Sequence, residues 1–246
     1  MLALLPDTQH RPTVLACDTS QQACSVALAL ADGSIIERLE KTGSGHTEKL
    51  PLMIADILES SGVSLQDLDR LGVTVGPGTF AGVRAGLSAM RAIRISHHLQ
   101  IYPMTTTHAL ALPLQQMTQE DDARHCIVAI DARRGELYCQ IFDAQGHPVC
   151  EVMAHTPEAL VKIIAKEGLS RANIIGSGSE TLAALMHGDD VLCLETPFWP
   201  QAGLIADWVA CQEVLPENKP PPEPLYLRPP DAVPPDASSF LTRQEG

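Results

Sequence analysis

The chain has 246 residues, of which 45% are hydrophobic, and a net charge of −13 with only 17 lysines and arginines. This length suits one large domain or two lobes, and the acidic balance argues against a chain that binds nucleic acid by itself, because such a surface repels a phosphate backbone. The seven cysteines are odd in number and form no C-x-x-C pair, which predicts reduced, buried thiols and neither a disulfide framework nor a zinc site.

Residues 1–12 are expected to form a loose extension and not a signal peptide, because Pro6 and Asp7 break their short apolar run. No apolar run is long enough to cross a bilayer, so we expect no membrane contact and a cytoplasmic location. Three strands follow in the sequence, at 14–17, 23–30 and 35–39.

The stretch 71–96 predicts a strand, a glycine turn and a long helix. The turn is Gly76-Pro77-Gly78, and Thr79 is placed to cap the helix that follows. Free N–H groups at such a helix start can cradle a phosphate, although the turn lacks the Lys-Ser/Thr ending of a P-loop. The alternative, which the sequence favours, is a tight turn without a ligand.

Two helices of this half carry more apolar or small faces than one sheet contact needs. The first is predicted over 46–61, with an apolar stripe of Leu50, Met53, Ile54 and Ile57. The second is predicted over 79–96, with a nearly bare face of Gly82, Ala85, Gly86 and Ala89, an apolar face of Val83, Leu87 and Met90, and an edge of Arg84, Arg91 and Arg94. We therefore predict that both helices also contact another chain.

The second half restarts the same pattern after a polar break at 119–124. Further elements are predicted before and after it, with strands at 101–104, 126–130, 136–142, 149–153 and 174–175, and helices at 108–117, 157–166, from 180, and at 201–214. Proline dominates 216–235, which predicts an extended or disordered tail that the core fold does not need, at least beyond Asp231.

The two halves form an internal repeat. Gly33 lies fifteen residues after Asp18, and Gly146 lies fifteen residues after Asp131. Each half ends in a Gly-x-Gly turn and a helix, at Gly76 and Gly176. A duplicated βββαβα unit is the plan of the actin/Hsp70/sugar-kinase (ASKHA) superfamily, so we predict an α/β fold of two lobes with mixed sheets flanked by helices. The expected division is an extension at 1–12, lobes at 13–118 and 119–215, and a proline-rich tail at 216–246.

Five motifs resemble, in order, the bacterial TsaB (YeaZ) family, the accessory subunit of tRNA threonylcarbamoyladenosine biosynthesis. They are ACDTSQQACSVAL, GHTEKLPLM, GPGTFAGVRAGLS, AIDARRGELY and PLYLRPPD. The resemblance extends over about residues 13–231. The most specific is GPGTFAGVRAG, in which the family usually has Ser and Thr where this chain has Thr79 and Ala81.

The resemblance implies a non-catalytic scaffold that pairs with a catalytic TsaD-like paralogue and works with a small TsaE-like P-loop ATPase. It implies pairing through the two first-lobe helices, and we expect isolated copies to form a homodimer through the same surface. The expected contact residues are Leu50, Met53, Ile54, Ile57, Gly82, Ala85, Gly86, Ala89, Met90 and Arg91. We expect no cofactor or metal on this chain, ATP and metal in the partner subunits, and contact with tRNA only through the complex.

Asp18 and Asp131 stand where ATPases of the superfamily keep aspartates that direct phosphate and Mg²⁺, but Ser20 and Arg133 replace the glycine two residues on. We interpret both aspartates as Asx-turn residues. The predicted vestigial phosphate loops comprise Asp18, Gly76, Gly78, Thr79, Asp131, Gly176 and Gly178.

No two histidines are three or four residues apart, so a helical metal pair is absent and His46 is interpreted as a capping or surface residue. No catalytic residue is identified. The alternatives are an active ATP-dependent kinase or ATPase of the same superfamily and, less favoured, a metallopeptidase.

Overall fold

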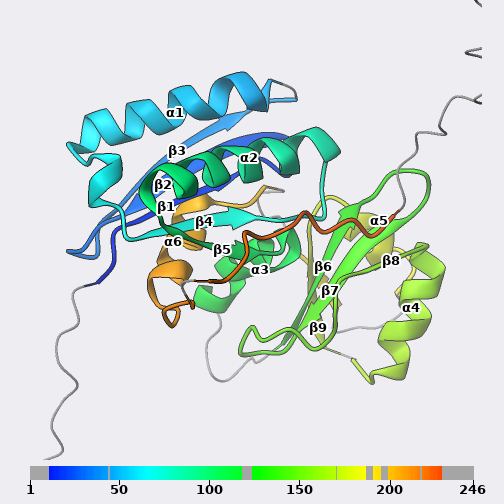
Figure 1. Cartoon of the computed structure of the whole chain (residues 1–246). Coiled ribbons are helices and arrows are strands. Elements are labelled where there is room, and N and C mark those ends of the chain that lie inside the picture. The colour runs from blue at the N-terminus through cyan, green and yellow to red at the C-terminus, as the bar shows by residue number, and fades with distance from the viewer. Residues whose placement is uncertain are drawn as a thin grey trace, which may run out of the picture.

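The computed structural model describes residues 11–43, 45–117, 124–169, 171–186, 191–194, 199–216 and 218–228. The expectations for most of the N-terminal extension, for most of the polar break at 119–124 and for the tail beyond residue 228 lie outside these ranges. The described chain forms two lobes, each built on a five-stranded sheet (Figure 1).

The first sheet has the order β3-β2-β1-β4-β5. Its strands are β1 (Val14–Asp18), β2 (Ala23–Ala29), β3 (Ile35–Lys41), β4 (Arg70–Thr74) and β5 (Gln100–Met104). The first three pair antiparallel, and β1, β4 and β5 pair parallel. The carboxyl ends of β1 and β4 therefore meet at one edge, which brings the Asp18 turn beside the glycine turn.

The second sheet repeats this topology, with the order β8-β7-β6-β9-β10. Its strands are β6 (His125–Asp131), β7 (Leu137–Phe142), β8 (Met153–His155), β9 (Ala172–Ile175) and β10 (Val191–Cys193). Again the first three pair antiparallel, and β6, β9 and β10 pair parallel. The predicted duplicated two-lobe fold is confirmed.

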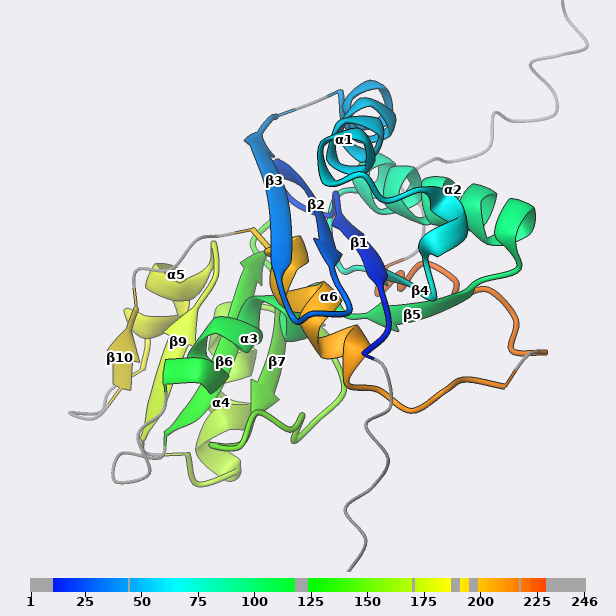
Figure 2. The same cartoon turned by 90° about the vertical axis from the view of Figure 1, so that its left-hand side faces the viewer.

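The helices are α1 (His46–Ser61), α2 (Phe80–His97), α3 (Thr106–Met117), α4 (Pro157–Lys166), α5 (Ser179–Ala183) and α6 (Ala202–Ala210), with a 3₁₀ turn at Leu65–Asp67. Helices α1 and α2 cover one face of the first sheet, and α6 covers the other (Figure 2). Helix α3 packs on β6 and β7 of the second sheet. Helix α3 thus lies in the range expected for the first lobe but packs on the second sheet, and α6 lies in the range expected for the second lobe but packs on the first sheet.

Helix α6 is held at both ends by side chains of the first sheet. At its start, the amide of Ala202 donates to Ser25 Oγ at 2.8 Å and the amide of Gly203 donates to Glu37 Oε1 at 3.2 Å. At its end, Arg70 donates to the carbonyls of Val209 and Gln212 at 2.9 and 2.7 Å. These bonds satisfy backbone groups that every helix end leaves free. Helix α6 ends at Ala210, earlier than the predicted residue 214.

Strands β1 and β2 of the first sheet are buried on both faces. On β1, Leu15 and Cys17 lie under α1 and α2, whereas Val14 and Ala16 lie under α6. This alternation follows from the two-residue period of a strand. In the second lobe, the strand expected at 149–153 begins only at Met153. The side-chain amide of Gln140 donates to the carbonyl of Cys150 at 3.1 Å.

Candidate functional site

The glycine turn after β4 packs directly on the turn after β1. The amide of Thr79 donates to the carbonyl of Ser20 at 2.8 Å, and a Cβ on Gly78 would collide with the same carbonyl oxygen. Thr79 caps α2 as expected, since its side chain accepts from the amide of Gly82 at 3.2 Å. The two turns therefore fill the space that a phosphate would need between them.

Asp18 is fully buried in this contact. Its Oδ1 accepts from the amide and hydroxyl of Ser20, at 3.2 and 2.6 Å, and from the hydroxyl of Thr74 at 2.5 Å. The bond to the Ser20 amide closes an Asx turn, as predicted. Its Oδ2 has no hydrogen-bond partner among the described residues. Burial raises the pKa of Asp18 to about 6, against the lowering effect of these hydrogen bonds.

The second lobe repeats the closed arrangement. Asp131 Oδ1 accepts from the amide of Arg133 at 2.8 Å, which confirms the second Asx turn. A Cβ on Gly176 would collide with the carbonyl oxygen of Ala129, and the amide of Gly178 donates to that oxygen at 2.9 Å. The first glycine turn thus packs on the turn after β1, and the second packs on Ala129 of β6.

These turns do not fit the phosphates of a nucleotide. In the first lobe the carbonyl of Ser20 lies over Gly78, and the carbonyl oxygen of Leu225 lies 3.0 Å from the Cβ position of Gly76. The glycines that would allow close approach of a ligand are occupied by the chain's own backbone. The tight-turn alternative raised by the sequence is therefore the one that the geometry supports.

The described residues bring together no three His, Cys, Asp or Glu side chains as a metal site. His46 is the first residue of α1, but it is buried, and its Nε2 lies 3.0 Å from the carbonyl oxygen of Gln21. The expectation of a capping or surface role is wrong, because the ring packs under the Asp18 turn segment. No described helix is both long and apolar enough to cross a membrane.

Most of the expected contact residues belong to the chain's own core. The apolar stripe of α1 faces the first sheet, and so does the apolar face of α2. The buried members are Leu50, Met53, Ile54, Ile57, Gly82, Gly86 and Met90. The inference that these side chains leave surplus apolar surface is wrong, since β2 and β4 already cover them.

The bare face of α2 also packs against another segment of the same chain. The hydroxyl of Thr19 donates to the carbonyl of Gly82 at 2.7 Å, and it lies 2.8 Å from the Cβ position of Gly86. The two glycines thus admit the turn after β1. Only Ala85 and Ala89 of this face are partly exposed.

The outward side of the helix pair includes Ala85 and Ala89, which were expected contact residues, and five residues that were not expected there. Leu52 on α1 is 71% exposed, and Ile95 on α2 is 74% exposed. The small side chains Ala81, Ala85, Ser88, Ala89 and Ala92 are exposed or partly exposed on α2 and lie at helical spacing with Ile95. We call Leu52, Ile95 and these five residues the outer face. The signal in the sequence that could have revealed this face was a single Leu and a single Ile on helix sides that otherwise carry polar or small residues.

The arginine edge of α2 binds the C-terminal segment Asn218–Arg228, which we call the strap. Arg84 donates to the hydroxyl of Tyr226 at 2.8 Å. Arg91 donates to the carbonyl of Pro222 at 2.5 Å, and Arg94 donates to the carbonyl of Lys219 at 2.9 Å. Arg91 is therefore half-buried under the strap. The sequence predicted an extended or disordered tail, whereas this part of the tail is docked on α2.

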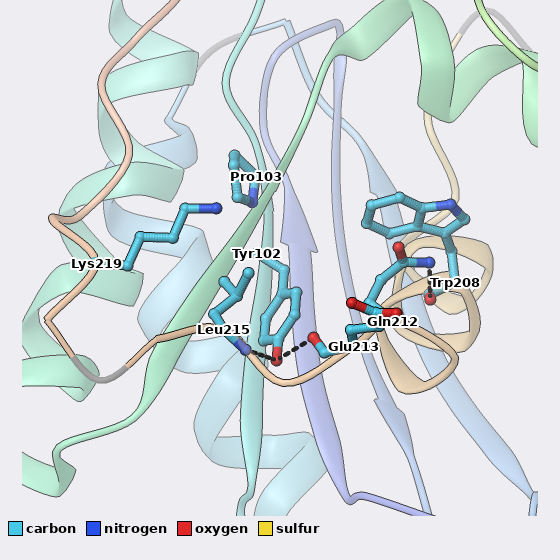
Figure 3. A pocket seen from close by; sticks show the side chains of 7 residues that line it. All are labelled: Tyr102, Pro103, Trp208, Gln212, Glu213, Leu215 and Lys219. Atoms are coloured by element: carbon cyan, nitrogen blue, oxygen red, sulfur yellow. Dashed lines mark hydrogen bonds between the residues drawn. The ribbon is translucent and has the colours of Figure 1, made fainter.

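A hollow of about 360 Å³ lies where the chain leaves α6 (Figure 3). It is lined by Tyr102, Pro103, Trp208, Gln212, Glu213, Leu215 and Lys219. The hydroxyl of Tyr102 donates to the carbonyl of Glu213 at 3.2 Å and accepts from the amide of Leu215 at 3.3 Å. The hollow contains none of the expected site residues, and its tyrosine hydroxyl is engaged by backbone.

Comparison with known proteins identifies relatives for this arrangement. Residues 40–192 match the family model described as TsaD, tRNA N6-adenosine threonylcarbamoyltransferase. The tRNA threonylcarbamoyladenosine biosynthesis protein TsaB of Escherichia coli is 37% identical over 125 residues, which are 51% of this chain and 52% of that protein. The chain thus spans about half the length of the curated TsaB relatives that it matches.

Two further relatives match over most of their length. An uncharacterized protein of Mycobacterium tuberculosis is 28% identical over 231 residues, covering 90% of this chain and 94% of that protein. The crystal structure of a Pseudomonas aeruginosa protein with similarity to peptidase YeaZ has a TM-score of 0.71 and 25% identity, and covers 88% of this chain and 100% of that one. From the family model, the chain belongs to the family described as TsaD, tRNA N6-adenosine threonylcarbamoyltransferase, and it is similar to proteins named TsaB and YeaZ.

Proposed function

We propose that this chain is a non-catalytic accessory subunit for threonylcarbamoyl transfer to the adenosine next to the tRNA anticodon. In this proposal it activates a catalytic TsaD-like paralogue by binding it. The relatives named for tRNA threonylcarbamoyladenosine biosynthesis support the pathway. The observation that carries the role is the outer face of α1 and α2, which lies opposite the side that packs on the sheet.

The outer face suits a close contact between helices. Its small side chains let a second helix approach toward the lower end of the usual 8–10 Å interaxial range, while Leu52 and Ile95 supply large apolar groups at the two sides. Exposed apolar side chains that gather on one surface mark interaction sites. The paralogue would share this fold, so a pseudo-two-fold contact between equivalent helix pairs is the expected geometry, and a homodimer would use the same surface.

The closed glycine turns support a chain that performs no chemistry itself. A nucleotide's phosphates have no place between Ser20 and Gly78 in the first lobe, or between Ala129 and Gly176 in the second. We therefore assign ATP and metal to the partner subunits, which include the catalytic paralogue and a TsaE-like P-loop ATPase. With a net charge of −13, this chain would meet tRNA only through the complex.

Reconstitution tests this function. The chain is combined with its own organism's catalytic paralogue and P-loop ATPase, and threonylcarbamoyladenosine is measured in unmodified tRNA. We expect product from the complete mixture, none when this chain is omitted, and none with Ile95→Glu on the outer face. The matched control is Val149→Glu, which places the same charge on an exposed position of the second lobe and should leave the product unchanged.

The active ATPase alternative predicts a different result. In that case Asp18→Asn would abolish product formation while the complex still assembles, and the purified chain alone would hydrolyse ATP. Either of these outcomes would overturn the accessory role. Full product formation without the chain would do the same.

A further inference from the structure

The strap runs along α2 in the opposite direction to the helix. Its contacts descend the arginine edge in order, from Lys219 at Arg94, through Pro222 at Arg91, to Tyr226 at Arg84. Prolines at 220, 221, 222 and 224 restrict the backbone to an extended course. Such a segment loses less conformational entropy on docking than a flexible one.

The strap is anchored in the first lobe at the glycine turn. The amide of Leu225 donates to the carbonyl of Val75 at 2.7 Å, and the Leu225 side chain packs on the core under α1 and α2. The ring of Tyr226 stacks on Phe80, with centroids 5.5 Å apart, and Arg84 lies 3.7 Å from the centroid of Phe80. Stacked rings and a guanidinium over an aromatic face each add a favourable contact.

Three residues later the strap reaches the second lobe. Arg228 donates to the carbonyl of Ala132 at 2.9 Å, forms an ion pair with Glu136, and lies 5.5 Å from the ring centroid of Tyr138. The turn that it contacts contains Arg133 with a φ of 61°, a left-handed conformation that is unfavourable for a residue with a side chain. Arg228 thus stabilises a strained turn at the carboxyl end of β6.

The strap therefore joins the turn after β4 in the first lobe to the turn after β6 in the second. Leu225 bonds the chain just before Gly76 in the first lobe, and Arg228 bonds the chain just after Asp131 in the second. Figure 1 shows the strap crossing from α2 to the second lobe as the last described segment. We propose that the strap is a clasp that fixes the relative position of the two lobes, and that its release lets them move.

This clasp is a property of the chain alone and does not depend on the proposed function. The two halves of the strap have distinct roles in this clasp. The half at α2 holds the strap in place, whereas Arg228 makes the strap's bonds to the second lobe. Loss of Arg228 should therefore free the lobes while the strap stays on α2.

The chain's own cysteines allow a direct test. Cys193 lies on β10 of the second lobe, and Cys211 lies at the end of α6 on the first sheet, and both are exposed, whereas Cys150 is half-buried and the other four are buried. In a Cys150→Ser background, spin labels on Cys193 and Cys211 report the distance between the lobes by pulsed electron resonance. We expect one narrow distance distribution for the full chain and the same distribution for a chain that ends after Arg228.

The clasp predicts that a chain ending after Leu215 shows a broadened or shifted distribution. In the full chain, Arg228→Ala should broaden it in the same direction, and Arg228→Lys, which keeps the charge opposite Glu136, should broaden it less. Hydrogen exchange of the Ala132 and Glu136 amides should rise at least tenfold in Arg228→Ala. If the shorter chain fails to fold, Arg228→Ala decides. An unchanged distance distribution and unchanged exchange in Arg228→Ala overturn the proposal.

Discussion

The hydroxyl of Thr19 donates a hydrogen bond to the carbonyl of Gly82, 2.7 Å away, across the contact between the β1 turn and helix α2. The contact is possible because position 82 has no side chain, since a Cβ there would collide with the carbonyl oxygen of Thr19. A helix face that looks prepared for a partner in the sequence is thus used within the chain. The other side of the same helix carries the exposed and partly exposed residues of the outer face.

Gly86→Ala should destabilise the fold although alanine is the better helix former. The new Cβ would lie 2.8 Å from Thr19 Oγ1 and 3.4 Å from Val73 Cγ2. Overpacking of this kind costs about 1–3 kcal/mol, which outweighs the gain of up to ~1 kcal/mol in helix propensity. Urea unfolding measures the difference. In a Thr19→Ala background the same change should become neutral or stabilising, and an equal loss in both backgrounds would contradict this contact.

Leu52→Glu should weaken self-association and Met53→Glu should destabilise the fold, although the two residues are adjacent in the sequence. Leu52 is 71% exposed on the outer face, whereas Met53 is 6% exposed and packs in the core. We expect Leu52→Glu to change the free energy of unfolding by less than about 0.5 kcal/mol and to weaken self-association. A buried carboxylate at position 53 should cost several kcal/mol. Thermal unfolding and sedimentation distinguish them, and equal destabilisation would place Leu52 in the core.

Asp18 should make the fold more stable as the pH falls from 7 to 5. Its pKa is raised to about 6 in the folded chain, so the folded state binds this proton more tightly than the unfolded state, and the gain is lost as the pH rises through 6. The contribution between these two pH values is about 1 kcal/mol. Because burial lowers the pKa of His108, that residue opposes the trend as the pH falls.

The comparison of wild type with Asp18→Asn isolates the carboxyl group, because His108 is present in both. The difference in unfolding free energy between the two proteins should change by about 1 kcal/mol between pH 7 and pH 5, in favour of wild type at pH 5. A difference that is constant over this range would mean that Asp18 titrates normally.

Ser25→Ala should loosen helix α6 from the first sheet. The mutation leaves the amide of Ala202 without its acceptor at 2.8 Å, in a site where both residues are fully buried. Loss of a helix cap or of a buried acceptor costs about 1–2 kcal/mol. Hydrogen exchange of the first α6 amides and urea unfolding both report it. Ser88→Ala, at an exposed position of α2, is the matched control and should cost almost nothing.

The sequence was sufficient for the topology because the repeat preserves both the order of the elements and the turn residues. Asp18 and Asp131 occupy equivalent turns, and Thr79 caps α2 as its type and place predict. These features depend on local backbone chemistry, which residue types determine directly.

The faces of the helices were predicted less well. Periodicity shows that Leu50 and Met53 share a face, but it does not show which face meets the sheet when a second face is made of glycine and alanine. That choice depends on Thr19, which lies 63 residues from Gly82 in the sequence. The docking of Tyr226 on Arg84 is likewise a contact across 142 residues, and no local pattern reveals it.

The affinity of this chain for its catalytic paralogue tests the accessory role most directly. Purified wild type, Ile95→Glu and the control Val149→Glu are each titrated with the paralogue by calorimetry, and the mass of each product is measured. We expect a one-to-one complex for wild type and Val149→Glu, and affinity weakened by at least a hundredfold for Ile95→Glu, because a charge would be buried in the helix contact. Equal affinity for Ile95→Glu and wild type, or no complex with wild type, would contradict the account.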